Sequence, residues 1–179
     1  PIDIPDVVFE LPTSTYGPYR IRPLGDINAD GYDDIGFTTG NSQHRIIKII
    51  LGGSFQTYDL YDLLYYDDSI MISGIGDVNG DGISDYHIKK PLYSTGLSQN
   101  ILSVHFGSSN FPVLDSVVIC PNTNSYIQDY GAAIGDVNGD GIGDFISYIY
   151  SEAKVWFGGP NITTQWDTVL TESVYTEVG

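Results

Sequence analysis

The chain contains the stretch IGDVNGDGISDY at residues 75–86, a near-identical stretch IGDVNGDGIGDF at 134–145, and a looser copy, LGDINADGYDDI, at 24–35. Their first aspartates, Asp26, Asp77 and Asp136, are separated by intervals of 51 and 59 residues. In each copy an apolar residue and a glycine precede this aspartate, and a short β-prone run follows. Self-similarity at such a spacing is the signature of a repeat architecture, so we interpret the chain as three repeats.

More than the acidic stretch recurs. Each repeat next contains a strand-like segment that ends in an apolar residue and glycine: IIKIILGG at 46–53, ILSVHFGS at 101–108 and AKVWFGG at 153–159. A last segment reads YDLYDLL at 58–64, LDSVVI at 114–119 and WDTVL at 166–170. Each repeat is therefore expected to form four short strands separated by Gly, Asn, Asp and Pro turns, and no window shows helical periodicity.

These features predict an all-β fold of β-propeller blades, as three four-stranded antiparallel repeats, with stacked solenoid sheets as the alternative. We expect one repeat array over 1–179, divided into the end strand of a preceding blade (1–18), blade 1 (19–64), blade 2 (65–122) and blade 3 (123–179). Three blades are too few to close a ring, so we expect either part of a larger propeller or open ends that meet other copies. The opening PIDIPDVVFE, which does not begin with Met, favours a processed product or an excerpt of a longer chain.

The composition narrows the partners. The chain has 23 acidic and 7 basic residues, for a net charge of -16, so it lacks the basic face that binding to nucleic acid or to anionic lipid requires. Its longest apolar runs are far too short to span a membrane. Cys120 is the single cysteine, so no internal disulfide can form. The sequon at Asn161 is expected to be a chance match in a turn.

The acidic stretches follow the pattern Asp-x-Asn-x-Asp-Gly-x-x-Asp, which places side-chain oxygens at loop positions 1, 3, 5 and 9. A backbone carbonyl at position 7 would add a further oxygen. Hard oxygen ligands without His or Cys favour Ca²⁺, and closely held carboxylates repel one another unless a cation is present. A plain hairpin turn is the alternative, but a turn does not need aspartate at positions 1 and 9 in every copy. We therefore predict three structural calcium sites.

The predicted ligands are Asp26, Asn28, Asp30, Tyr32 and Asp34; Asp77, Asn79, Asp81, Ile83 and Asp85; and Asp136, Asn138, Asp140, Ile142 and Asp144, with Tyr32, Ile83 and Ile142 contributing carbonyl oxygens. These loops are not EF-hands, because position 12 is Phe37, Ile88 or Ser147 instead of glutamate and the flanks are predicted strands.

The loop pattern followed by a strand ending in Phe-Gly resembles the FG-GAP (VCBS-type) repeat over about residues 19–170. Such repeats occur in the β-propellers of integrin α subunits and in many secreted bacterial and fungal proteins. The resemblance implies propeller blades with Ca²⁺ in the loop between the first and second strands. Two features depart from it: the first copy has Leu51-Gly52 in place of Phe-Gly, and no copy contains Gly-Ala-Pro.

Catalytic motifs are not apparent. The chain shows no Gly-x-Ser-x-Gly, His-Glu-x-x-His or phosphate-loop pattern, and His44, His87 and His105 occupy unrelated repeat positions. Tyrosines 61, 65 and 66 and tryptophans 156 and 166 are expected to fill space between blades, although such rings can also stack on a ligand.

We therefore expect a non-catalytic, calcium-stabilised module that mediates adhesion, ligand binding or self-assembly. Its expected partners are a protein, a glycan or other copies of itself. The alternative is the propeller portion of a secreted polysaccharide-acting enzyme, a lyase or hydrolase, with catalytic residues elsewhere. A secreted or cell-surface location is expected, because millimolar extracellular calcium fills even weak sites.

Overall fold

The structure of the chain is a computed structural model that describes Val8 and residues 16–41, 44–64, 70–94, 97–112, 115–123, 131–149 and 152–170. In these residues every regular element is a β-strand, which confirms the predicted all-β class. The same residues contain no helix that is long and apolar enough to cross a membrane.

The strands form three antiparallel sheets of four, and within each sheet the strand order follows the chain. Sheet 1 contains β1 (Tyr16–Gly25), β2 (Asp34–Gly40), β3 (His44–Ile50) and β4 (Thr57–Leu64). Sheet 2 contains β5 (Met71–Gly76), β6 (Asp85–Ser94), β7 (Leu97–Phe106) and β8 (Asp115–Thr123). Sheet 3 contains β9 (Ala132–Gly135), β10 (Asp144–Ile149), β11 (Glu152–Trp156) and β12 (Thr168–Leu170).

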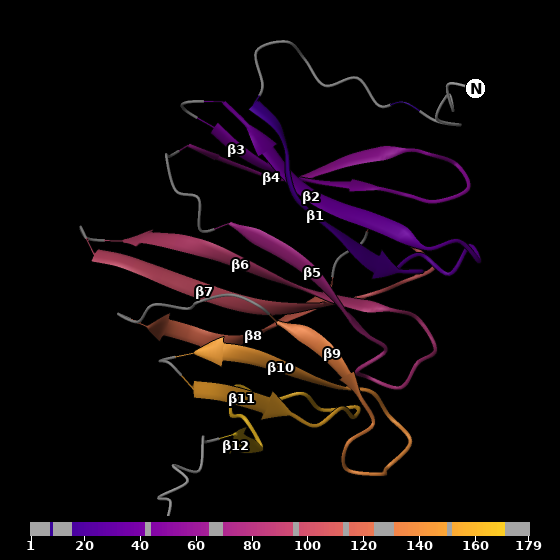
Figure 1. Cartoon of the computed structure of the whole chain (residues 1–179), viewed down its shortest axis with the longest axis vertical. Coiled ribbons are helices and arrows are strands. Elements are labelled where there is room, and N and C mark those ends of the chain that lie inside the picture. The colour runs from indigo at the N-terminus through magenta and orange to yellow at the C-terminus, as the bar shows by residue number, and fades with distance from the viewer. Residues whose placement is uncertain are drawn as a thin grey trace, which may run out of the picture.

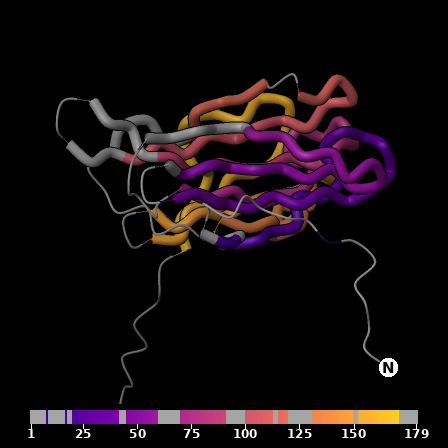
Figure 2. Tube along the Cα trace, turned by 90° about the horizontal axis from the view of Figure 1, so that it is seen from above, coloured from indigo at the N-terminus to yellow at the C-terminus, as the bar shows by residue number. Residues whose placement is uncertain are grey.

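The three sheets are stacked in chain order, as propeller-like blades would be (Figure 1). Viewed along the stack, their strands overlap and run in similar directions (Figure 2). The first strands of the sheets are neighbours, because β1 contacts β5 and β5 contacts β9. Gly74 of β5 permits a close approach to β1, since a Cβ there would meet the backbone of Pro23 and Leu24 at 2.8 Å.

Two apolar clusters hold the sheets together. Between sheets 1 and 2, Ile27 of the loop after β1 and Ile49 of β3 belong to the same buried cluster as Tyr86 of β6. Between sheets 2 and 3, buried Val78 and Val104 join Phe145 and Trp156, whose rings stack with centroids 5.2 Å apart. The strands therefore place branched and aromatic side chains on both faces of sheet 2, as the middle layer of a stack requires.

Of the two tryptophans predicted to fill space between blades, only Trp156 does so. Trp156 is 1% exposed and packs between sheets 2 and 3, as predicted. Trp166 is instead 41% exposed, and the Lys154 ammonium lies 3.2 Å from its ring centroid, which is a cation–π contact and not inter-sheet packing. The side chains of Tyr61, Tyr65 and Tyr66 lie outside the described part of the structure.

The first and last strands give the extent of the sheets along the chain. Sheet 1 begins at Tyr16, where β1 pairs with β2 (Tyr16↔Gly40), and the pair contains three irregular register shifts. β4 ends at Leu64, and β8 extends to Thr123. Apart from Val8 and residues 16–18, the segment predicted as an end strand lies outside the described residues.

Candidate metal-binding loops

The three acidic loops connect the first and second strands of their sheets and lie along the same side of the stack (Figure 1). We name them loop 1 (26–34), loop 2 (77–85) and loop 3 (136–144). This is the place that the pattern predicted, because the last aspartate of each loop is the first residue of β2, β6 or β10.

Loop 2 shows how the oxygens are arranged. Asp77 accepts hydrogen bonds from the amides of Gly80 and Asp81 on Oδ1, at 2.7 and 3.1 Å, and from Gly82 on Oδ2 at 2.8 Å. The Asp81 amide is shared with Asn79 Oδ1 at 2.9 Å, so the oxygens of positions 1 and 3 converge on one N–H group. Asp81 Oδ1 accepts from Ile83 N at 2.9 Å, which curls the loop around its own side chains.

Loops 1 and 3 repeat this arrangement. In loop 3, Asp136 accepts from three amides and Asn138 shares the amide of Asp140. Loop 1 lacks one bond, from position 4, where Ala29 replaces the glycine of the other loops. Ala29 nevertheless has φ 58°, close to the 81° and 80° of Gly80 and Gly139. The loop shape is therefore imposed on an alanine in the left-handed region.

The aspartate at position 9 is fully buried in every loop and acts as a bridge. Asp85 Oδ2 accepts from Val78 N at 2.9 Å, and its Oδ1 accepts from Gly107 N at 2.8 Å. The equivalent carboxylates Asp34 and Asp144 bind equivalent amides in their own sheets. Each one ties the start of its loop to the turn that follows the third strand.

Burial raises the pKa of two of these bridging carboxylates, Asp85 and Asp34. Loss of solvent raises the pKa of Asp85 to about 7, although the amides of Gly107 and Val78 oppose the shift. The negative charges of Asp81 and Asp77 raise the pKa further. Burial also raises the pKa of Asp34 above its ordinary value. The ionised carboxylate is thus held in a poorly solvated place beside charges of the same sign.

The glycine of the Phe-Gly element donates its amide to the bridging aspartate at position 9. A Cβ on Gly107 would collide with the carbonyl oxygen of Ser84, and one on Gly158 with that of Gly143. Only glycine allows the amide to reach the carboxylate at position 9. Sequence reasoning assigned this aspartate to metal binding and missed the bridge, although the joint recurrence of Asp and Gly in all three repeats is the signal that could have found it.

The predicted ligands are brought together loop by loop, and their fit to a cation can be judged from the contacts. Side-chain oxygens of positions 1, 3 and 5 gather around the amides of positions 4 to 7, and hydrogen-bonded carboxylate oxygens retain lone pairs for a cation. In the described residues, no three His, Cys, Asp or Glu side chains form a ready metal-binding group. The residues fit a hard cation in number and chemistry, with carboxylates at positions 1, 5 and 9 and an amide oxygen at position 3.

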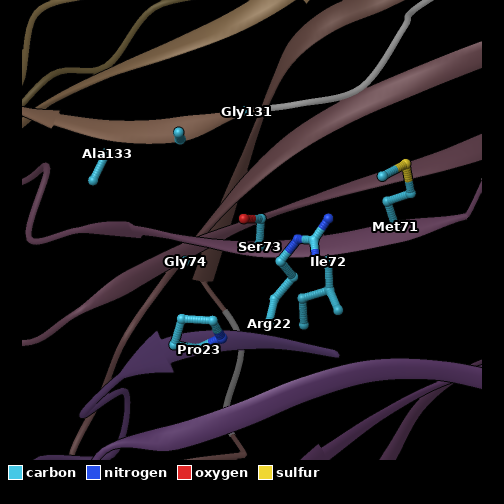
Figure 3. Close-up of a pocket in the computed structure, with 9 residues that line it drawn as sticks. Arg22, Pro23, Met71, Ile72, Ser73, Gly74, Gly131 and Ala133 are labelled. Carbon is cyan, nitrogen blue, oxygen red and sulfur yellow. The ribbon is translucent and has the colours of Figure 1, made fainter. Parts of the chain in front are cut away.

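A second candidate site lies between the first strands of the sheets. It is a pocket of about 290 Å³, where Arg22 of β1 points toward Ser73 and Met71 of β5 (Figure 3). Gly131 and Ala133 border it from the side of sheet 3. Among its described lining residues only Arg22 and Ser73 have polar side chains, so these side chains offer no acid–base pair.

The histidines are placed by the strands and not by the loops. His87 of β6 and His105 of β7 are buried, at 0% and 2% exposure, and His44 is the first residue of β3. His105 stacks on Tyr86 with centroids 5.3 Å apart, and its Nε2 lies 2.9 Å from Ser103 Oγ. Burial lowers the pKa of His105 to about 4, and electrostatic interaction with Lys90 and His87 acts in the same direction.

Comparisons with known proteins do not identify a family: no protein-family model matches the chain, and no curated protein matches it significantly.

Proposed function

We propose that the chain is a non-catalytic, calcium-stabilised β-propeller module of the FG-GAP or VCBS type. Each of its three acidic loops would hold one Ca²⁺ through the oxygens of positions 1, 3, 5, 7 and 9. The module acts outside the cell in adhesion, ligand binding or self-assembly, and its partner is a protein, a glycan or another copy.

One observation carries the calcium part of this proposal. In three separate loops, the side-chain oxygens of positions 1 and 3 turn inward onto the amide of position 5, and the side-chain oxygen of position 5 accepts from the amide of position 7. An ordinary hairpin does not need acidic side chains there, and the number of carboxylates is costly without a compensating positive charge. The cation would supply that charge and link the loop to the buried carboxylate that begins the next strand.

Calorimetric titration tests the proposal directly. After treatment with EGTA and desalting, we expect about three Ca²⁺ to bind per chain and the melting temperature to rise with calcium. When free Ca²⁺ is at a hundred times the Kd of a site, its binding adds about 2.7 kcal/mol to the free energy of unfolding. An unchanged melting curve and a titration without binding would overturn the calcium assignment.

Loop variants sharpen the test. Replacing positions 1 and 5 of loop 2, as Asp77→Asn with Asp81→Asn, is expected to lower the stoichiometry by one, and the same double change in loop 3 by one more. The matched control is Asp33→Asn, which removes an exposed carboxylate from loop 1 at a position that the pattern does not assign as a ligand. Equal loss in the control and in the ligand variants would show only a general charge effect.

The non-catalytic part has its own test. The purified protein is incubated with a panel of polysaccharides, and both retention and product release are measured. We expect retention at most, because the loop acids have a role as ligands and the described lining residues of the pocket carry no carboxylate. Turnover that persists through further purification would favour an enzyme.

A further inference from the structure

Equivalent pairs of backbone hydrogen bonds join neighbouring sheets along the side of the stack where the acidic loops lie. In each pair the donors are the amide of loop position 8 and the amide after the Phe-Gly glycine, and the acceptors are the carbonyls of positions 1 and 2 of the preceding loop. The bonds are Ser84 N to Asp26 O (3.0 Å), Ser108 N to Ile27 O (2.9 Å), Gly143 N to Asp77 O (3.3 Å) and Gly159 N to Val78 O (2.8 Å). The same contact is therefore built twice within the chain.

Side chains complete this repeated contact. Ile27 and Val78, at position 2 of loops 1 and 2, are 0% exposed under the next sheet. Ile142, at position 7 of loop 3, lies over loop 2, since a Cβ on Gly80 would be 3.2 Å from its Cδ1. The junction of sheets 2 and 3 thus combines two backbone hydrogen bonds with apolar contacts of Val78 and Ile142, and the junction of sheets 1 and 2 combines two such bonds with the buried Ile27.

Sheet 3 carries the acceptor half of this contact, the carbonyls of positions 1 and 2 with the apolar side chain of position 2, and no described residue covers it. Val137, the counterpart of Ile27 and Val78, is 57% exposed. Gly139 is the counterpart of Gly80, and an added Cβ there would meet no atom within 4 Å. In the described part of the chain, no backbone amide donates to the carbonyl of Asp136 or to that of Val137.

Sheet 1 carries the donor half of the contact, the amides of position 8 and of the residue after the Phe-Gly glycine or its counterpart. Tyr32, at position 7 of loop 1, is 60% exposed, and Ile35 is 40% exposed where the equivalent Tyr86 and Phe145 are fully buried. The donors would be the amides of Asp33 and Gly53, and neither has a backbone acceptor among the residues that the structure describes. The two ends of the stack are therefore complementary halves of a contact that the chain already uses.

We propose that these ends bind each other between two copies of this chain, an inference that rests on the assembly role within the proposed function. The outer face of sheet 3 in one copy, at loop 3, docks on the outer face of sheet 1 in the next copy, at loop 1. Val137 packs against Tyr32 and Ile35, and the carbonyls of Asp136 and Val137 accept from the amides of Asp33 and Gly53. Such a head-to-tail contact either closes a ring or continues as a filament.

The charge of the chain sets the conditions. At a net charge of -16, copies repel one another at low ionic strength, and salt screens this repulsion. Light scattering and sedimentation of the 179-residue chain, from 1 to 500 μM at 150 mM NaCl, are expected to show mass rising with concentration. At 10 mM NaCl the rise should shift to higher concentration. A particle that stays monomeric throughout the range at 150 mM NaCl overturns the proposal.

Complementation distinguishes head-to-tail docking from any other association. Val137→Asp disables one end and Ile35→Asp the other, and each variant alone is expected to be monomeric. Mixed in equal amounts they should form a 1:1 dimer, because the intact end of one meets the intact end of the other. Val118→Asp, which places the same charge at a 40% exposed apolar position on the middle sheet, should associate as the parent does.

A mixture that remains monomeric, or single variants that associate like the parent, would refute the docking. The mixed dimer also shows that both variants are folded. Calcium titration of the same variants separates the two proposals: loss of association with three calcium ions still bound bears on the docking alone, and absence of calcium binding in an associating parent bears on the metal alone.

Discussion

The carboxylate of Asp85 accepts a hydrogen bond from the amide of Gly107 at 2.8 Å, although 22 residues separate the two along the chain. The other oxygen of Asp85 accepts from Val78 N at 2.9 Å. One buried side chain thereby joins the acidic loop, the second strand and the turn after the third strand. Because sheets 1 and 3 contain the same bridge, the acidic loop is part of the framework of each sheet and not an appendage to it.

The first prediction concerns this bridge. At pH 8 in EGTA, Asp85→Asn should lower the free energy of unfolding by about 1–3 kcal/mol, because the new amide nitrogen would face a backbone donor and leave it unsatisfied. Urea unfolding followed by circular dichroism measures the loss. Asp81→Asn, at an exposed loop position, is the control and should change stability little without calcium. Equal midpoints for the two variants would show that the bridge contributes nothing.

The second prediction concerns the glycine that receives the bridge. In Gly107→Ala the new Cβ would be forced onto the carbonyl oxygens of Ser84 and Ile27, which are backbone atoms that cannot rotate away. We expect a loss of about 1–3 kcal/mol, the usual cost of overpacking. Gly17→Ala, at an exposed glycine whose added Cβ meets nothing within 4 Å, should be close to neutral by the same thermal melt. Comparable melting temperatures for the two variants would contradict the steric argument.

Much of the fold could be predicted from repetition and turn chemistry. The position of each loop between the first two strands, the four-stranded units and the packing of Trp156 follow from local patterns that recur three times. Two things could not be read in this way. The bridge from Asp85 to Gly107 depends on which backbone donors meet a side chain in space, and a list of oxygen-bearing residues does not contain that information.

The second is the pocket that Arg22 shares with Ser73 and Met71, which arises where strands distant in the sequence come together. The same holds for Trp166. The sequence predicts that it fills space between blades, but its ring is exposed and lies under the Lys154 ammonium. Periodicity identifies which face of a strand is apolar, whereas the neighbour of an exposed ring is decided by tertiary geometry.

A third prediction follows from Ala29. Its φ of 58° is one that alanine adopts at a cost of roughly 1–2 kcal/mol and that glycine adopts freely. Ala29→Gly should therefore stabilise the chain by up to about 1 kcal/mol, the gain being reduced by the greater freedom of glycine in the unfolded state. Gly80→Ala, the reverse change at the same position of loop 2, should destabilise. Denaturant midpoints in EGTA measure both, and shifts of the same sign would refute this account.

The last prediction concerns acid stability. Because His105 has a folded-state pKa of about 4 against an ordinary 6.5, the unfolded chain takes up a proton at this site before the folded chain does. The stabilising contribution is therefore complete above about pH 6.5 and is lost as the pH falls toward 4. A gap of this size corresponds to on the order of 3 kcal/mol. The raised pKa of Asp85 acts in the opposite direction, since its contribution is lost as the pH rises through about 7.

Substitution isolates the histidine from the carboxylate. His105→Phe retains an aromatic ring beside Tyr86 but cannot titrate, whereas Asp85 titrates in both proteins. Urea midpoints at pH 7.5 and pH 4.5, measured without calcium, should fall further in the parent than in the variant. The variant gives up the contact with Ser103 at both pH values, so that cost cancels in the comparison. An equal fall in the two proteins would mean that His105 is protonated in the folded state at pH 4.5, and that its burial does not exclude the charge.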